Sequence, residues 1–243
     1  MVMPARAAAG LFLLAALLPA EDPPKDLPKD PPRSGGFLRN YGAMQKRIWL
    51  SPFRRDKRDL LTRAAPLAAG TAALLIFDRR ISRGLPNTQD QVDWSNRVSH
   101  AGGIYSLAAV SALPLVVGKL GGNRTAWSVG STAVEALAAS VTVNYALKYS
   151  LGRERPDRGV GNGPFFRWGR DSFPSGHSMS TWAVCTAIAR HRRTPKWAKV
   201  ASYAVAASVS LSRVGARRHF ASDVFAGAVL GGMIGNHAAT RPR

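Results

Sequence analysis

Apolar residues are grouped along most of the chain in long blocks whose length and composition are typical of helices. Six alanine-rich runs carry no charge or a single one. Few windows alternate with a period of two, so strands should be scarce. We therefore predict an all-α fold, a helical bundle of about six core helices within residues 64–238. The runs are Ala64–Phe77, Ala101–Gly118, Thr125–Leu147, Ser178–Ala189, Val200–Ser212 and Val224–Gly235.

The lengths of these runs leave two kinds of bundle open. Ala101–Gly118 and Thr125–Leu147 are long enough to span a membrane, whereas the other runs have about 12 to 14 residues, nearer to buried core helices. Basic residues on the links at 119–124 and 190–199 resemble those of cytoplasmic loops and would place the opposite ends of the runs outside. Six spans after a cleaved leader would reverse this orientation, so an integral bundle and a soluble exported bundle both remain open.

Shorter segments flank the apolar runs. Residues 1–20 begin with a basic residue and continue with an uncharged stretch, which favours an export signal peptide or, if uncleaved, an N-terminal anchor. Residues 21–36 are rich in proline and charge and should form an extended linker. Residues 37–63 mix cations with large apolar groups, which suits an anionic membrane surface or a solvated face packed on the domain. Residues 79–100 indicate a loop that ends at a helix start, and residues 239–243 form a basic tail.

The charge balance of the chain narrows the choice of partners. Lys and Arg outnumber Asp and Glu by 34 to 14, which gives a net charge of +20 at pH 7. This charge should attract nucleic acid, an acidic membrane surface or a phosphorylated substrate. Nucleic acid is the least favoured partner, because the chain shows no helix-turn-helix pattern and no zinc-finger spacing. Cys185 is the one cysteine of the chain and lies in an apolar run. Because there is a single cysteine, an intrachain disulfide and a thiolate zinc site are excluded.

Three polar clusters lie between the apolar runs, and the first contains Lys148 and Arg155. Both follow a long apolar run, next to Pro156, which should stop or bend the helix. Lysine supplies a compact point charge and arginine a planar fork, a pairing that suits phosphate. Cations at a helix C-terminus also interact favourably with the helix dipole, so this cluster alone does not establish a site.

The second cluster is the tetrapeptide from Pro174 to His177, directly before an apolar helical run. The free N–H groups of that helix's first turn would bind phosphate well. Gly176 permits close approach of an oxyanion, Ser175 offers a hydroxyl, and His177 supplies an ionisable proton. A serine at this position is also a common helix cap.

The third cluster places His219 and Asp223 four residues apart, which is one turn of a helix. The carboxylate could then accept a proton from one imidazole nitrogen and leave the other as a nucleophile. Such a pair also occurs as an ordinary surface interaction. Arg213 adds a third cation. Together the clusters suit displacement at phosphorus, where positioning and charge neutralisation supply most of the catalysis. No carboxylate cluster for Mg²⁺ and no His/Cys set for zinc is visible in the sequence, so the cations would replace a metal.

These residues resemble the phosphatidic acid phosphatase type 2 (PAP2) and vanadium haloperoxidase superfamily. Its pattern is Lys-x6-Arg-Pro, Pro-Ser-Gly-His and Ser-Arg-x5-His-x3-Asp. Lys148–Pro156, Pro174–His177 and Ser212–Asp223 match every fixed position at those spacings. The resemblance implies an all-helical bundle over about residues 64–238, and residues 1–63 lie outside it.

The resemblance also implies a role for each matched residue. His219 would attack phosphorus to form a phosphohistidine, with Asp223 orienting it, and His177 would protonate the leaving oxygen and then activate water. The same pocket holds vanadate in the haloperoxidases. The residues that would hold the phosphoryl oxygens are Lys148, Arg155, Arg213, Ser175 and the N–H of Gly176.

We therefore expect an exported or envelope-bound, metal-independent phosphatase whose active site faces the extracytoplasmic side. Its substrate would be a phosphate monoester or diphosphate, with a lipid phosphate favoured. Three alternatives stay open: a soluble exported acid phosphatase acting on small esters, a vanadate-dependent haloperoxidase, and an envelope protein that binds anions without catalysis. Vanadate would be a cofactor only in the second of these.

Overall fold

The computed structural model describes residues 37–54, 65–158 and 162–240 of the chain, and this part is helical. The predicted all-α class is confirmed, and the six predicted core helices are α4 and α6 to α10. Predictions for residues 1–20, 21–36, 55–63 and 241–243 concern segments outside the described residues. The elements are α2 (Phe37–Arg54), α4 (Ala65–Gly84), α5 (Gln89–Ser99), α6 (Ile104–Leu120), α7 (Arg124–Leu151), α8 (Gly176–Ala189), α9 (Lys196–Gly215) and α10 (Ala221–Ala239), with short 3₁₀ turns η2 (His100–Gly102) and η3 (Pro156–Arg158).

The predicted loop at 79–100 is wrong, because α4 continues to Gly84 and α5 begins at Gln89. Local hydrogen bonds explain the extra helix. The Thr88 hydroxyl caps α5 by accepting a hydrogen bond from the Gln91 N–H at 3.3 Å. The Gln89 side chain donates to Asp93, one turn further on, at 2.9 Å. Capping and pairs at this spacing stabilise a helix whose polar composition lacks the apolar face that pattern reading requires.

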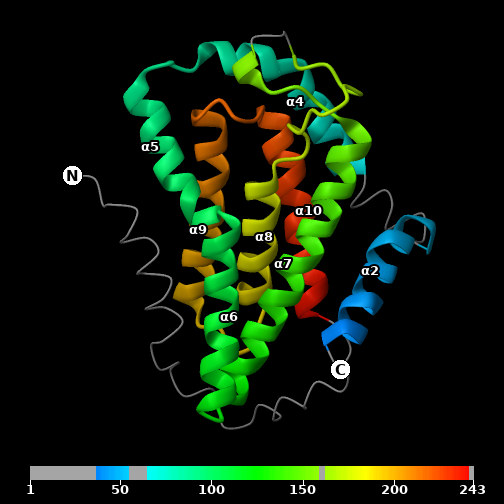
Figure 1. Ribbon diagram of the computed structural model, residues 1–243, viewed down its shortest axis with the longest axis vertical. Coiled ribbons are helices and arrows are strands. Elements are labelled where there is room, and N and C mark those ends of the chain that lie inside the picture. The colour runs from blue at the N-terminus through cyan, green and yellow to red at the C-terminus, as the bar shows by residue number, and fades with distance from the viewer. Residues whose placement is uncertain (1–36, 55–64, 159–161, 241–243) are drawn as a thin grey trace.

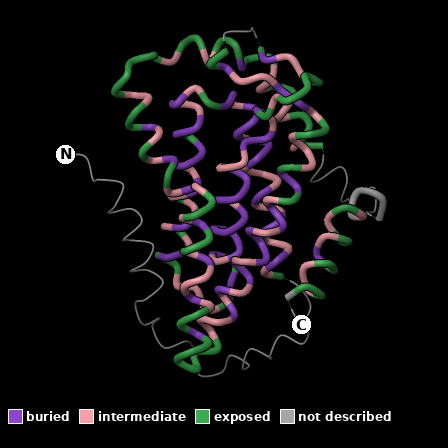
Figure 2. The backbone as a smooth tube through the Cα atoms, in the orientation of Figure 1, coloured by how far each residue is buried: buried purple, intermediate pink, exposed green. Residues whose placement is uncertain are grey.

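Helix α8 forms the centre of the bundle, with α7, α9 and α10 packed around it (Figure 1). Buried positions run along its whole length (Figure 2). Met179 and Ala183 of α8 pack against Ala136 of α7 and Ile234 of α10 in one apolar cluster. Because α8 is covered on most sides, its apolar residues need not follow a single face.

Glycines bring the backbones of α10 and α8 into direct contact. Gly227, Gly231 and Gly235 recur every four residues and therefore share one face of α10. A Cβ atom at Gly231 would lie 2.1 Å from the carbonyl oxygen of Met179, and one at Gly227 would lie 2.7 Å from that of Ser175. This close packing fixes the start of α10 against the start of α8, where two of the three polar clusters lie.

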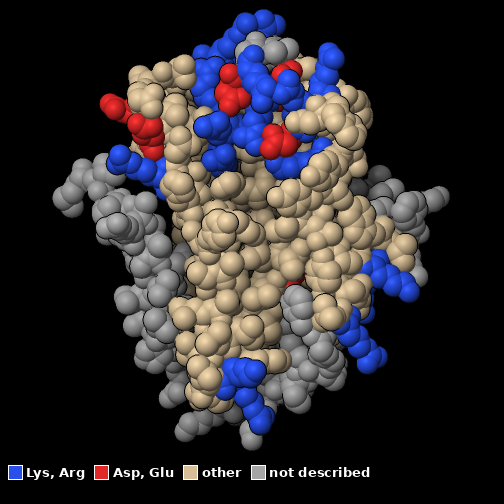
Figure 3. Space-filling view, in the orientation of Figure 1, with Lys and Arg blue, Asp and Glu red and all other residues tan. Residues whose placement is uncertain are grey.

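The loops that carry the three clusters gather at one end of the bundle, opposite the α6–α7 and α8–α9 connections (Figure 1). Lys and Arg side chains lie at both ends, and the band between them is mostly uncharged on the face shown in Figure 3, apart from Lys and Arg side chains at its right edge. The continuous helical stretch Gln89–Leu120 contains an 18-residue segment with a mean hydropathy of 1.7, of which 28% is buried, so by length and composition it could cross a membrane. No other helix in the described part of the chain meets both criteria, and Thr125–Leu147, predicted to be of spanning length, is therefore not among the candidates.

Candidate active site

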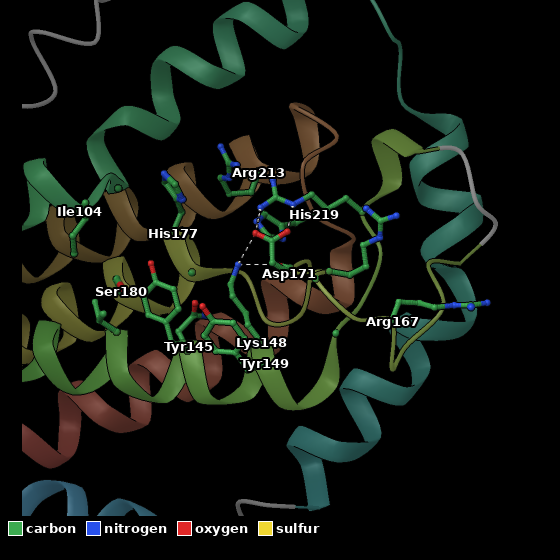
Figure 4. A pocket seen from close by; sticks show the side chains of 18 of the residues that line it. Ile104, Tyr145, Lys148, Tyr149, Arg167, Asp171, His177, Ser180, Arg213 and His219 are labelled. Carbon is green, nitrogen blue, oxygen red and sulfur yellow. Dashed lines mark hydrogen bonds and ion pairs between the residues drawn. The ribbon is translucent and has the colours of Figure 1, made fainter.

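A cavity of about 720 Å³ opens at the end of the bundle where the three clusters meet. Both imidazoles predicted to act on the substrate line this one cavity, so they can address the same bound group (Figure 4). Six of the eight predicted site residues contribute to the lining: Lys148, Arg155, Gly176, His177, Arg213 and His219.

The first turn of α8 faces this cavity through Gly176 and His177. Ser175 precedes the helix, but its side chain makes no capping hydrogen bond. Its hydroxyl oxygen is buried and has no hydrogen-bond partner among the described residues. A buried polar atom without a partner is costly, so an orphan hydroxyl beside a helix N-terminus fits a site whose missing partner is an anion.

The three predicted cations line the cavity together with Arg167 and Arg170. Arg213 is buried, its Nη1 donates to the Ser99 hydroxyl at 2.9 Å, and its Nε has no hydrogen-bond partner within the described part of the chain. Lys148 Nζ donates to the backbone carbonyl of Asp171 at 2.6 Å. Arg155 holds the Asp171 carboxylate with both prongs of its fork, at 2.9 and 2.7 Å. The guanidinium of Arg155, which we expected to bind a phosphoryl group, therefore binds a carboxylate in this structure.

The charge of Asp171 is stabilised by these neighbours. Partial burial acts to raise the pKa of Asp171, but the hydrogen bonds from Arg155 and the charge of Lys148 outweigh it and hold the pKa below its ordinary value. Asp171 is 53% exposed, so an incoming anion could displace its carboxylate into solvent.

His219 lies in the link before α10, not on the same helical turn as Asp223. The direct hydrogen bond predicted from the spacing is not formed, since Nδ1 is 3.8 Å from the nearest carboxylate oxygen of Asp223. Nδ1 instead lies 2.8 Å from the backbone carbonyl oxygen of Ser172. A carbonyl can only accept, so Nδ1 carries the proton and Nε2 of the neutral ring is left with its lone pair.

Burial keeps this imidazole neutral. Desolvation lowers the pKa of His219 to about 4, although the nearby Asp223 carboxylate acts in the opposite direction. At pH 7 the ring is therefore unprotonated at Nε2, as a nucleophile requires.

Asp223 acts on His219 through Ser172. The carboxylate accepts hydrogen bonds from the Ser172 hydroxyl at 2.6 Å and from the Phe220 N–H at 2.9 Å, the second of which caps α10. Ser172 in turn holds the imidazole through its carbonyl. The other carboxylate oxygen of Asp223 accepts from Arg153 Nη1 at 2.6 Å.

Sequence reasoning missed four residues of this site: Asp78, Arg153, Asp171 and Ser172. Asp78 is the only acidic residue in α4 and follows an apolar run, which was a weak signal. Arg153 stands two positions before Arg155 and could not be distinguished from it as the buried member of the pair. Among the residues that the structure describes, no three His, Cys, Asp or Glu side chains are grouped in a way that could hold a metal ion.

Comparisons with known proteins find phosphatases among the proteins similar to this chain. The lipid A 1-phosphatase of Porphyromonas gingivalis is 40% identical over 90 residues, which are 36% of this chain and 18% of that protein. The chain thus spans less than a fifth of the length of this curated relative. The crystal structure of a transmembrane PAP2-type phosphatidylglycerolphosphate phosphatase from Bacillus subtilis matches 72% of this chain and 92% of its own, with a TM-score of 0.57. At 23% sequence identity, this structural match shows a shared fold and nothing more.

A sequence model of the PAP2 superfamily matches residues 130–242. This segment contains all three polar clusters and helices α8 to α10. Over residues 130–242, slightly less than half of its length, the chain is therefore similar to the PAP2 superfamily.

Proposed function

We propose that the chain is a metal-independent phosphatase that hydrolyses the terminal phosphate of a lipid phosphate through a phosphohistidine intermediate. The observation that carries this proposal is the shared cavity, where His177 and His219 meet the three predicted cations and the first turn of α8. Two buried atoms next to this cavity have no hydrogen-bond partner in the described part of the chain. They are Nε of Arg213, which lines the cavity, and Oγ of Ser175, which directly precedes the lining residue Gly176. A phosphoryl group supplies acceptor oxygens for both.

The proposed chemistry uses two steps at phosphorus. Burial and the neighbouring cations lower the pKa of His177 to about 3, and the negative charge of a bound phosphoryl group would raise this pKa and allow the ring to carry a proton. His219 Nε2 donates its lone pair to phosphorus, the bond to the leaving oxygen breaks, and protonated His177 gives its proton to that oxygen. His177 then removes a proton from water, which attacks the phosphohistidine and releases inorganic phosphate. Lys148, Arg155 and Arg213 neutralise the charge on the phosphoryl oxygens, a role that metal ions fill in other phosphoryl-transfer enzymes.

A lipid substrate is supported by the apolar side of the cavity. Ile104, Val141, Tyr145 and Tyr149 line it next to the polar end, and Trp168 is almost fully exposed at its rim. These groups would contact the hydrocarbon next to the phosphate rather than the phosphate itself. The names of the relatives, a lipid A 1-phosphatase and a phosphatidylglycerolphosphate phosphatase, support the same substrate class.

Membrane association follows from the same proposal. The candidate span Gln89–Leu120 includes α6, and the charge-poor band of Figure 3 would lie in the bilayer with the cavity at its extracytoplasmic surface. Carbonate extraction of membranes from expressing cells tests this placement. Retention in the membrane pellet is expected, and release by high salt alone would instead favour a soluble acid phosphatase.

Purified protein assayed for phosphate release from phosphatidic acid in mixed micelles tests the activity. His219→Ala and His177→Ala should each lower kcat by at least about a hundredfold. His100→Ala is a matched control, because this histidine is exposed and does not line the cavity. Turnover that survives loss of either cavity histidine would overturn the mechanism, and halide oxidation only after vanadate addition would favour a haloperoxidase. Turnover in EDTA tests the proposal that no metal is required.

A further inference from the structure

Arg153 is a completely buried cation behind the cavity. Its side chain is 0% exposed, and its guanidinium carbon lies 4.8 Å from the ring centroid of Phe165 and 4.3 Å from that of Phe220. All five of its N–H groups have an acceptor, so the side chain has one orientation. The acceptors are the Gly163 carbonyl at 3.2 Å, Asp223 Oδ1 at 2.6 Å, Ser222 Oγ at 2.7 Å, Asp78 Oδ2 at 2.8 Å and the Asn162 carbonyl at 2.5 Å.

Two carboxylates share this one guanidinium, and the second comes from outside the PAP2-matched segment. Asp78 lies on α4 and is 0% exposed. It also accepts the Ser222 N–H at 3.0 Å and the Ser222 hydroxyl. Asp78 thus joins α4 to the first turn of α10, 144 residues further along the chain.

The charges of this group explain why a second carboxylate is useful. Arg153 and Asp223 alone would form a neutral pair. Because Asp78 neutralises Arg153, the three groups together carry one net negative charge, and Asp223 can present it toward His219. In a buried, low-dielectric setting such a charge acts strongly on a neighbouring imidazole.

A continuous path of hydrogen bonds connects Asp78 to the nucleophile, His219. Arg153 fixes Asp223, Asp223 accepts from the Ser172 hydroxyl at 2.6 Å, and the Ser172 carbonyl accepts from His219 Nδ1 at 2.8 Å. Arg153 also holds Ser172 directly, since its own carbonyl accepts the Ser172 N–H at 2.9 Å. Each member of this path is buried.

We infer that Asp78 is a positioning residue for the reaction: through Arg153 it fixes Asp223 and Ser172, and so aims His219 Nε2 at the phosphorus atom. This inference rests on the proposed phosphatase function. Asp78 does not line the cavity, so its loss should impair alignment of the nucleophile and leave the cations that bind phosphate in place.

The test compares Asp78→Asn with Asp157→Asn, both assayed on phosphatidic acid in mixed micelles. Asp157 pairs with Arg218 at 3.2 Å on the surface of the same end of the bundle, so the control removes the same charge. Two inhibition constants separate alignment from folding. Vanadate adopts the five-coordinate geometry of phosphoryl transfer and requires an aligned nucleophile, so its inhibition constant reports on the alignment of His219. The inhibition constant for inorganic phosphate reports on binding by the cations of the cavity. Neither constant depends on the fraction of folded protein.

We expect Asp78→Asn to lower kcat by about tenfold or more, since a displacement on the order of 1 Å can cost about a hundredfold in rate. The inhibition constant for vanadate should rise by a similar factor, and that for phosphate should stay within about twofold of the parent. Asp157→Asn should match the parent in all three. If Asp78→Asn does not fold, Ser222→Ala removes a hydroxyl that contacts both Asp78 and Arg153 without changing charge, and it should shift kcat and the vanadate constant in the same direction.

An active parent with an unchanged vanadate constant in the folded variants would overturn the inference while leaving the phosphatase proposal intact. A loss of activity that only follows the amount of folded protein would do the same. A parent with no phosphatase activity would overturn both.

Discussion

The carboxylate of Asp171 occupies the fork of Arg155, and removing it should strengthen binding of the substrate phosphate. A phosphoryl dianion needs the same two N–H groups, Nε and Nη2, that now hold Asp171 at 2.9 and 2.7 Å. Binding must therefore break this ion pair first. Asp171→Asn removes the charge of the competitor and keeps its size.

The exposure of Asp171 sets the size of the effect. The side chain is 53% exposed, so water screens the pair, and such ion pairs contribute about 0.2 to 1 kcal/mol. If substrate binding no longer has to break this ion pair, KM should fall by about 1.4-fold to fivefold, since 1.4 kcal/mol corresponds to about a tenfold change in an equilibrium constant. The inhibition constant for inorganic phosphate should fall by the same factor, and kcat should stay within about twofold, because the reacting groups are unchanged.

Steady-state kinetics on phosphatidic acid and phosphate inhibition provide the assay. Asp157→Asn controls for the general rise in positive charge, because it removes an equivalent carboxylate that does not contact Lys148 or Arg155. A KM that rises, or that falls equally in both variants, would refute the view that Asp171 competes with substrate. It would assign Asp171 instead to holding Arg155 and Lys148 in place.

Three further predictions follow from the packing and charge of the site. Gly231→Ala should destabilise the fold by about 1 to 3 kcal/mol, since its Cβ would lie 2.1 Å from the Met179 carbonyl oxygen. At Gly232 the nearest atom is 3.9 Å from the added Cβ, so Gly232→Ala should be neutral or stabilise the fold by up to about 1 kcal/mol. Thermal unfolding in detergent compares the two variants, and equal effects would contradict the close contact of α8 and α10. Ser175→Ala should leave the unfolding temperature unchanged or raise it, because the variant removes an unsatisfied buried hydroxyl. It should lower kcat/KM about tenfold, because a charge-assisted hydrogen bond to the substrate is lost. A lower unfolding temperature with unchanged kcat/KM would show that Ser175 has a structural role instead. kcat/KM should fall as the pH drops through about 4, where His219 takes up a proton and loses its nucleophilic lone pair; an acid limb near the ordinary histidine value of 6.5 would contradict the desolvated environment of the ring.

The sequence alone determined the fold class and indicated that the three polar clusters lie together. Long apolar runs rich in alanine allow only helices, and they predicted α4 and α6 to α10 correctly. The three clusters lie at the ends of such runs, and a bundle with short connections brings run ends together. Lys148, Arg155, His177 and Arg213 could therefore be assigned to one cavity from residue type and spacing.

Only the tertiary structure decided which charged groups are buried and what holds each one. Asp78 and Arg153 are 75 residues apart, and no local pattern marks two such residues as partners, because the pairing depends on how α4 packs against α10. His219 and Asp223 show the reverse case: their spacing predicted a direct bond, but the start of α10 at Ala221 leaves His219 outside the helix, and Ser172 takes the place of the carboxylate. Residue type and local spacing establish which groups can react, whereas packing between distant helices establishes their partners, their charge state and their aim.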